Sequence, residues 1–181
     1  MKTVGFGARQ MRSYDNDLNS LLQKAEDILR QAQNSLRALY DENGLKYNGK
    51  GMSSVKGDIY SKVLGSYIQN QLGYRIDYEQ TLVGRIRADF VINDLISVEV
   101  KSMRVFTSVE DLAKRFERIV KAKPNMKHCV VGFHHTHNWV SKIKKRLAPL
   151  GVEHFMMTDS KNEIYGKELE RFVNFIKENG V

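Results

Sequence analysis

Two acidic residues and one lysine lie at a spacing that suits the binding of a divalent metal ion. Asp89 stands in the run RADFVIN, ten residues before the Glu99 and Lys101 of the run SVEVKS. Carboxylate oxygens are ligands of Mg²⁺, which needs few of them because water and phosphate oxygens fill its other positions. A lysine beside such an ion is able to orient a metal-bound water or to help deprotonate it. These residue types therefore predict a divalent-metal site with a lysine beside a metal-bound water.

The residues around these side chains predict two strands joined by a tight turn at Asn93-Asp94. Successive side chains point to opposite faces of a strand, so Glu99 and Lys101 share one face of the second strand. The other face of that strand carries Ile96, Val98 and Val100, which we expect to be buried. The first strand has an apolar row of Ile86, Ala88, Phe90 and Ile92 and a polar row of Arg85, Arg87 and Asp89.

The register between the two strands decides whether the acids meet. A two-residue turn that pairs Ile92 with Leu95 would leave the two acids on opposite faces, because a one-residue slip turns a strand over. Pairing Ile92 with Ile96 matches apolar residues and places Asp89 opposite Glu99. We predict this second register, or a β-bulge that restores it.

The pattern of Asp89 followed by Glu99-Val100-Lys101 resembles the PD-(D/E)XK nuclease superfamily, with Ala88 in place of the family's proline. The resemblance covers roughly residues 54–133. It implies a restriction-endonuclease-like α/β fold, in which a mixed sheet with the order αβββαβ is flanked by helices. It also implies that Asp89, Glu99 and the Val100 carbonyl hold Mg²⁺, for which Mn²⁺ is expected to substitute. Lys101 would then position the attacking water.

A helix predicted over residues 54–71 begins VKGDIYSKVLG, which resembles the opening helix of archaeal Holliday-junction resolvases. Lys56-Gly57 matches a pair in those enzymes, but Ser61 stands where they carry a glutamate. Asp58 lies one turn earlier and is a candidate for the missing catalytic carboxylate. The alternative is that Asp58 only stabilises the first turn of the helix through the helix dipole. Glu79 is the weaker candidate for a third acid.

The net charge of +8 and the pI near 9.5 favour a polyanionic partner, and DNA is the first candidate. Basic side chains near the predicted site are the expected phosphate contacts, with a simply solvated surface as the alternative for each. These residues are Lys50, Lys56, Arg85, Arg87, Arg104, Arg115 and Arg118. The chain has no apolar run long enough for a membrane span and no signal-peptide core, so we expect a cytoplasmic protein without a membrane partner.

Three parts are expected along the chain: a basic arm over 1–14, a long helix over 15–45 and a nuclease-like domain over 46–181. The long helix carries apolar residues in steps of four and three, which is the spacing of a coiled coil. This row consists of Leu18, Leu22, Ala25, Leu29, Ala32, Leu36 and Leu39. The row is able to pack against its own domain, against the same helix of a second copy, or against both. Because the row is long, we expect a homodimer.

The chain after Lys101 alternates between helices and strands. We predict a helix capped by Thr107 or Ser108, a buried strand in MKHCVVGF, a helix over 138–147, a strand in VEHFMMT and a closing helix over 166–178. This alternation predicts a mixed sheet with helices on both faces.

Together these features predict a Mg²⁺-dependent endonuclease acting on DNA. A structure-selective enzyme of the junction-resolvase kind is favoured over a restriction enzyme, because a compact basic dimer is able to read phosphates and DNA shape. One alternative is a nucleic-acid-binding protein of the same fold with a degenerate site, which Ser61 would favour. Another is an ordinary α/β domain on which Asp89, Glu99 and Lys101 form only a surface charge cluster.

Overall fold

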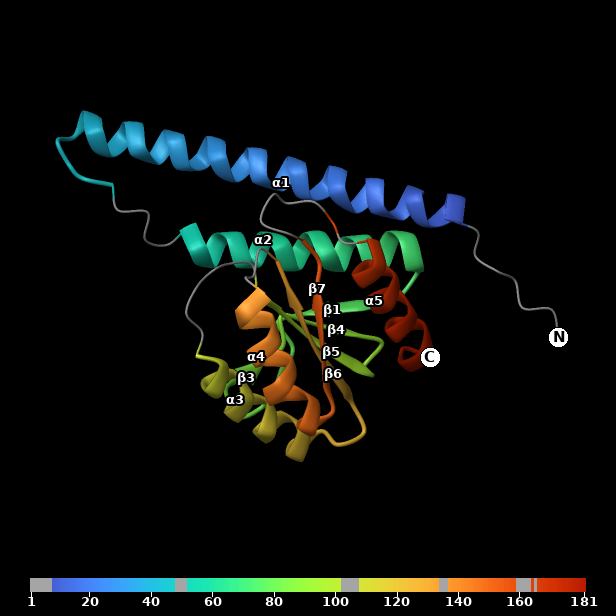
Figure 1. Ribbon diagram of the computed structural model, residues 1–181. Helices are drawn as coiled ribbons and strands as arrows, with labels where there is room; N and C mark the ends of the chain where they lie inside the picture. Colours follow the sequence, from blue (N-terminus) through green and yellow to red (C-terminus); the bar gives the residue numbers. More distant parts are fainter. Residues whose placement is uncertain (1–7, 48–51, 102–107, 134–136, 159–163, 165) are drawn as a thin grey trace.

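The computed structural model describes residues 8–47, 52–101, 108–133, 137–158, 164 and 166–181, and the predicted basic arm lies in part outside them. Helix α1 (Ala8–Glu42) begins earlier than the predicted start at Asp15. It runs beside α2 (Met52–Tyr67), which continues into a π-helical turn at Ile68–Leu72 and ends at Gly73, as predicted. Figure 1 shows these two helices lying across one side of the sheet.

Five strands form a mixed sheet in the order β1-β4-β5-β6-β7. The first three, β1 (Ile76–Tyr78), β4 (Phe90–Ile92) and β5 (Ile96–Lys101), pair antiparallel with one another. The last two, β6 (Lys127–Gly132) and β7 (Val152–Met156), continue the sheet in parallel with β5. Parallel neighbours need a crossover, and α3 (Val109–Ala122) and α4 (His137–Leu147), with a 3-10 turn at Ala148–Leu150, supply the two crossovers.

The sheet separates two apolar cores, so helices cover both of its faces as the sequence predicts. One core contains residues of α1, α2 and α5 (Gly166–Asn179), which pack on Phe90, Ile96 and Val98. The other contains residues of α3 and α4, which pack on Val91 and Val130. The row opposite Ile96, Val98 and Val100 on β5 therefore lies under α3, and it contains the buried polar residues Ser97 and Glu99.

The hairpin between β4 and β5 has the predicted register, because Ile92 pairs with Ile96. Asn93 and Asp94 both adopt left-handed backbone conformations, with φ of 49° and 62°, which asparagine and aspartate tolerate better than most residues. The Asn93 side chain accepts a hydrogen bond from the Arg75 N–H at 3.0 Å and donates one to the Gly180 carbonyl at 2.8 Å. The turn is thus tied to the strand before it and to the end of α5.

The structure corrects the prediction of an unbroken strand before this turn, and the strand-like run that precedes it is broken as well. The run from Tyr74 to Val83 breaks at Glu79, where φ is 53°, and the run from Arg85 to Ile92 breaks at Ala88-Asp89. Two backbone hydrogen bonds join the breaks, from Glu79 N to Asp89 O at 3.0 Å and from Ala88 N to Gln80 O at 2.9 Å. Beyond them, β2 (Thr81–Val83) and β3 (Ile86–Arg87) form a separate ribbon.

The bend moves two side chains of the predicted apolar row to the other face of the sheet. Ala88 packs in the core under α3 instead of joining the row of Phe90 and Ile92. A residue at a break no longer follows the period of two that holds within a regular strand. Ile86 packs in the same core as Ala88, for the same reason.

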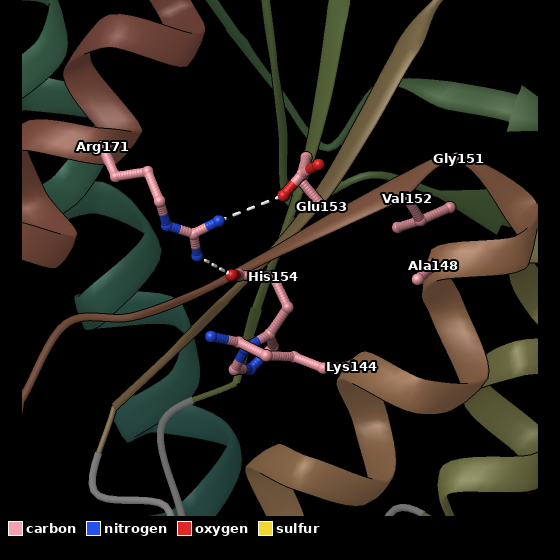
Figure 2. Close-up of a pocket in the computed structure, with 7 residues that line it drawn as sticks. All are labelled: Lys144, Ala148, Gly151, Val152, Glu153, His154 and Arg171. Atoms are coloured by element: carbon pink, nitrogen blue, oxygen red, sulfur yellow. Dashed lines mark hydrogen bonds and ion pairs between the residues drawn. The ribbon is translucent and has the colours of Figure 1, made fainter.

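The outer edge of β7 is covered by side chains of α5 beside a pocket of about 210 Å³ (Figure 2). Arg171 donates to the His154 carbonyl, and Glu168 Oε2 accepts from the Met156 N–H at 3.1 Å. Arg171 also pairs with Glu168 at 2.9 Å and with Glu153 at 3.1 Å. Since Met157 N bonds inward to β6, the Met156 N–H and the His154 carbonyl are among the backbone groups that face outward.

Candidate active site at the end of the central hairpin

The predicted acids lie opposite each other where β4 begins and β5 approaches its end. Phe90 pairs with Val98, so the same register places Asp89 opposite Glu99. Asp89 Oδ2 accepts a hydrogen bond from the Val100 N–H at 2.5 Å. In a continued strand a backbone carbonyl would accept that N–H, so the aspartate carboxylate extends the ladder by one bond beyond β4.

Glu99 is almost fully buried, with 4 % of its surface exposed, and two basic side chains contact its carboxylate. Lys101 Nζ lies 2.5 Å from Oε1. Arg115 of α3 approaches both oxygens, with Nη1 2.9 Å from Oε1 and Nη2 2.8 Å from Oε2. The same guanidinium donates to the Arg87 carbonyl. A buried charge of this kind is retained only when it is paired and hydrogen-bonded.

The second acid has an altered proton affinity. The pKa of Asp89 rises from 3.8 to about 6, because burial and, to a smaller extent, the nearby Glu99 carboxylate raise it. The Val100 N–H, Lys101 and Arg115 oppose this rise. A carboxyl group whose pKa is raised by another carboxylate marks a place where an additional cation would be favourable.

The oxygen atoms at this position fit a divalent cation of the Mg²⁺ class. Mg²⁺ is held by one or two carboxylates and keeps waters or phosphate oxygens elsewhere, and Asp89 and Glu99 supply that number. Leu95 and Lys101 accept bonds from β6, so the alternate residue Val100 turns its carbonyl to the side of Asp89. Among the described residues there is no group of three or more His, Cys, Asp or Glu side chains that could hold a metal. The fit therefore rests on two carboxylates and a carbonyl.

The structure separates the predicted third acids from each other. Asp58 is exposed on α2, which covers the face of the sheet opposite α3 and Glu99. The backbone of Glu79 lies next to that of Asp89, because the Glu79 N–H donates a hydrogen bond to the Asp89 carbonyl. Ser61 is buried, and its hydroxyl donates to the Gly57 carbonyl within the helix at 3.1 Å. The described contacts thus join Asp89, Glu99 and Lys101, and they do not link Asp58 to these three residues.

The predicted DNA contacts are distributed over several elements. Arg85 and Arg87 are exposed on the ribbon of β2 and β3, and Arg118 is exposed on α3. Lys56 lies 2.7 Å from Glu26 of α1 and 5.3 Å from the centre of the Tyr60 ring, so it joins the two helices. Lys50 and Arg104 lie outside the described residues.

Two features of the site were not predicted from the sequence. The contact of Arg115 with Glu99 is one, although a signal for it existed: position 115 lies three residues after Leu112 and four before Ile119, at the edge of the buried stripe of α3. The other is a buried pair next to Glu99, in which Ser97 Oγ lies 2.6 Å from His128 Nδ1. Burial lowers the pKa of His128, whose Nε2 lies 3.2 Å from the Lys123 carbonyl. The neutral ring therefore links the Lys123 carbonyl, at the end of α3, to Ser97 of β5, while His128 itself belongs to β6.

No protein-family model, curated protein or solved structure matches this chain. Within the described residues, no helix is long and apolar enough to cross a membrane.

Proposed function

We propose that this chain is a divalent-metal-dependent endonuclease that hydrolyses phosphodiester bonds in DNA. The observation that carries this proposal is the opposition of Asp89 and Glu99 at the end of the hairpin, with Lys101 bonded to Glu99. Two carboxylates and an ammonium group meet there on the side of the sheet that α3 covers. This is the arrangement that hydrolysis of a phosphodiester by a metal-bound water would need.

In the proposed reaction Asp89, Glu99 and the Val100 carbonyl hold Mg²⁺ or Mn²⁺. When bound, the ion supplies an activated water and offsets the negative charge that develops on the phosphate. Lys101 Nζ, which Glu99 holds in place, orients that water or donates a hydrogen bond to the developing charge. The Val100 N–H fixes the direction of the Asp89 carboxylate.

The order of the elements supports an assignment to the restriction-endonuclease-like fold. From α2 through β1, β4, β5 and α3 to β6 the chain runs helix, three strands, helix, strand. The ribbon of β2 and β3 is an addition to that αβββαβ order. The assignment agrees with the resemblance of the Asp89 and Glu99-Val100-Lys101 motif to the PD-(D/E)XK nucleases.

Charge and position support DNA as the substrate. The chain has a net charge of +8. Arg87 lies next to the site, because its backbone carbonyl accepts a hydrogen bond from Arg115, and its side chain is exposed. Contacts to phosphates read backbone shape and carry no base information, so we propose a structure-selective enzyme of the junction-resolvase kind.

Cleavage assays with matched variants test the function. Supercoiled, linear, single-stranded and four-way-junction DNA are incubated with the protein in Mg²⁺, Mn²⁺ or EDTA. We expect cleavage that needs the metal and that falls by at least about 100-fold in Asp89→Asn and in Lys101→Met. Asp94→Asn on the same hairpin and Lys127→Met at the start of β6 are the matched controls and should retain activity.

A second candidate is a protein of the same fold that binds nucleic acid without cutting it. The observation that favours it is the pairing of Glu99 by Lys101 and Arg115, together with the distance of Asp58 from the site in the fold. Binding of junction DNA without cleavage of any substrate in either metal would establish this candidate and contradict the first.

We also propose that two copies associate through α1. The first half of its apolar row, Leu18, Leu22, Ala25 and Leu29, is buried within the chain. The second half continues the same spacing, but Leu36 and Leu39 are exposed by 37 % and 54 %. A dimer would suit a substrate that is cut on two strands.

A further inference from the structure

We infer that Arg115 is an internal counter-ion that releases Glu99 when a divalent cation binds. The metal-free site is then closed by an ion pair, and metal binding is an exchange of one cation for another. This inference rests on the proposed function, because it concerns the same carboxylates.

The occupancy of the Glu99 oxygens is the first reason. Both oxygens lie within 2.9 Å of the Arg115 guanidinium, and Oε1 also bonds to Lys101. A metal ion requires at least one of these oxygens at bonding distance. Glu99 is buried, so an ion cannot approach it from an open side while both partners remain. One of the two basic groups must withdraw.

The different attachments of the two basic groups decide which one withdraws. Lys101 is two residues from Glu99 on the same strand face, so its ammonium stays beside the carboxylate. Arg115 reaches Glu99 from α3, and its side chain is 32 % exposed whereas that of Glu99 is 5 % exposed. Arg115 therefore has a path toward solvent.

A second anchor allows Arg115 to move without leaving the site. Its Nη2, which also lies 2.8 Å from Glu99 Oε2, donates to the Arg87 carbonyl, and this bond is able to persist when the contact with Glu99 is broken. After the exchange the guanidinium remains beside Arg87, where it would face a phosphate held by the metal. A planar guanidinium suits a phosphate through paired hydrogen bonds.

Titration calorimetry of the metal-free protein with Mn²⁺ alone tests the exchange. Arg115→Gln removes the competing charge, so we expect it to bind Mn²⁺ about tenfold more tightly than wild type, or tighter still. Arg115→Lys keeps the charge but loses the paired geometry and should lie between the two. Arg30→Gln removes an exposed arginine that pairs with Asp27 at 2.8 Å, and it should bind as wild type does.

Thermal unfolding supplies a second readout that does not depend on activity. Without metal, Arg115→Gln leaves a buried carboxylate with one partner fewer, so it should melt below wild type. Mn²⁺ should raise its melting temperature by more than it raises that of wild type.

Three outcomes overturn the inference, and one of them also overturns the proposed function. Equal or weaker Mn²⁺ binding by Arg115→Gln, with wild type binding normally, would sink the exchange alone. An equal rise in melting temperature for the two proteins would do the same. Absence of Mn²⁺ binding by wild type and by both Arg115 variants would remove the metal site and the endonuclease proposal with it.

Discussion

The surroundings of Asp89 favour opposite charge states of its carboxyl group. Its Oδ2 accepts a hydrogen bond from the Val100 N–H, which favours the ionised carboxylate. Its burial and the facing Glu99 favour the neutral acid, and together they prevail, because the pKa rises to about 6. At neutral pH in the metal-free protein, the ionised Asp89 carboxylate is therefore unfavourable for the folded state.

The raised pKa of Asp89 predicts how the stability of the protein changes with pH. The folded protein binds the Asp89 proton more tightly than the unfolded chain does, so protonation of Asp89 stabilises the fold. This stabilisation is complete below pH 3.8 and is lost as pH rises through 6. The rise in pKa from 3.8 to about 6 corresponds to about 3 kcal/mol. Urea unfolding in EDTA at pH 4 and pH 7.5 tests this. The free energy of unfolding of Asp89→Asn should rise relative to that of wild type by an amount of this order as pH rises.

Asp94 is the control for this measurement because its sign is opposite. A hydrogen bond from Arg75 lowers the pKa of Asp94, so its carboxylate favours folding fully above pH 3.8 and loses this effect only as pH falls through the lower pKa of the folded state. Between pH 4 and pH 7.5 Asp94→Asn should therefore not gain stability relative to wild type. A common direction for both variants would contradict the assignment of Asp89.

At this scale the sequence predicts what depends on alternation and register. The positions of Asp89 and Glu99 followed from matching Ile92 with Ile96, and that pairing is confirmed. The partner of Glu99 did not follow, because Arg115 comes from a helix sixteen residues away. The spacing places position 115 at an edge of the buried stripe of α3, but which edge turns toward β5 is decided by packing.

The bend of the strands before the hairpin belongs to the scale of the elements. The sequence around Glu79 and Ala88 alternates as a strand would, so alternation alone predicts no break. The break instead joins two distant positions through the bonds between Glu79 and Asp89 and between Ala88 and Gln80. Its effect is that β4 begins only at Phe90, which leaves Asp89 just before the strand, where its side chain accepts the hydrogen bond from the Val100 N–H.

The covered edge of β7 gives a prediction for α5. Arg171→Met removes the bond to the His154 carbonyl and the ion pairs with Glu153 and Glu168. The aliphatic part of the side chain still covers Phe155, whose ring centre lies 4.3 Å from the guanidinium carbon. We expect a loss of about 1–3 kcal/mol in the free energy of unfolding, measured with urea.

Lys167→Met is the matched control on the same helix, because Lys167 is exposed. It should change stability by less than about 0.5 kcal/mol. An equal loss in both variants would show that the charge of α5, and not the cover of the edge, accounts for the effect.

The whole molecule is asymmetric along α1. Its early turns close one core through Leu18, Leu22 and Leu29, whereas its later turns extend past the start of α2 (Figure 1). The heptad row predicted a surface for packing but not the division between the domain and a second copy. That division depends on the length of α2. The spacing of apolar residues on α1 gives no information about that length.

The proposed dimer gives a prediction at this scale. Replacing Leu36 and Leu39 together by serine should convert a dimer into a monomer, since both side chains are exposed in the single chain. Light scattering after size-exclusion chromatography measures the mass. Ile28→Ser is the control, because Ile28 is 61 % exposed but lies outside the heptad row. A monomeric wild type at high concentration would contradict the dimer.

The two ends of the sheet limit how copies of this chain could assemble. At one end β1 is only three residues long and stops before the left-handed Glu79, and at the other end Arg171 and Glu168 occupy two outward backbone groups of β7. Neither end offers a long row of open backbone groups, so sheets from two chains are prevented from merging into a continuous one. Assembly is left to helix surfaces such as the exposed part of α1, which lies on the face of the sheet opposite α3 and Glu99. Association through α1 would therefore leave the surroundings of Asp89 and Glu99 unchanged.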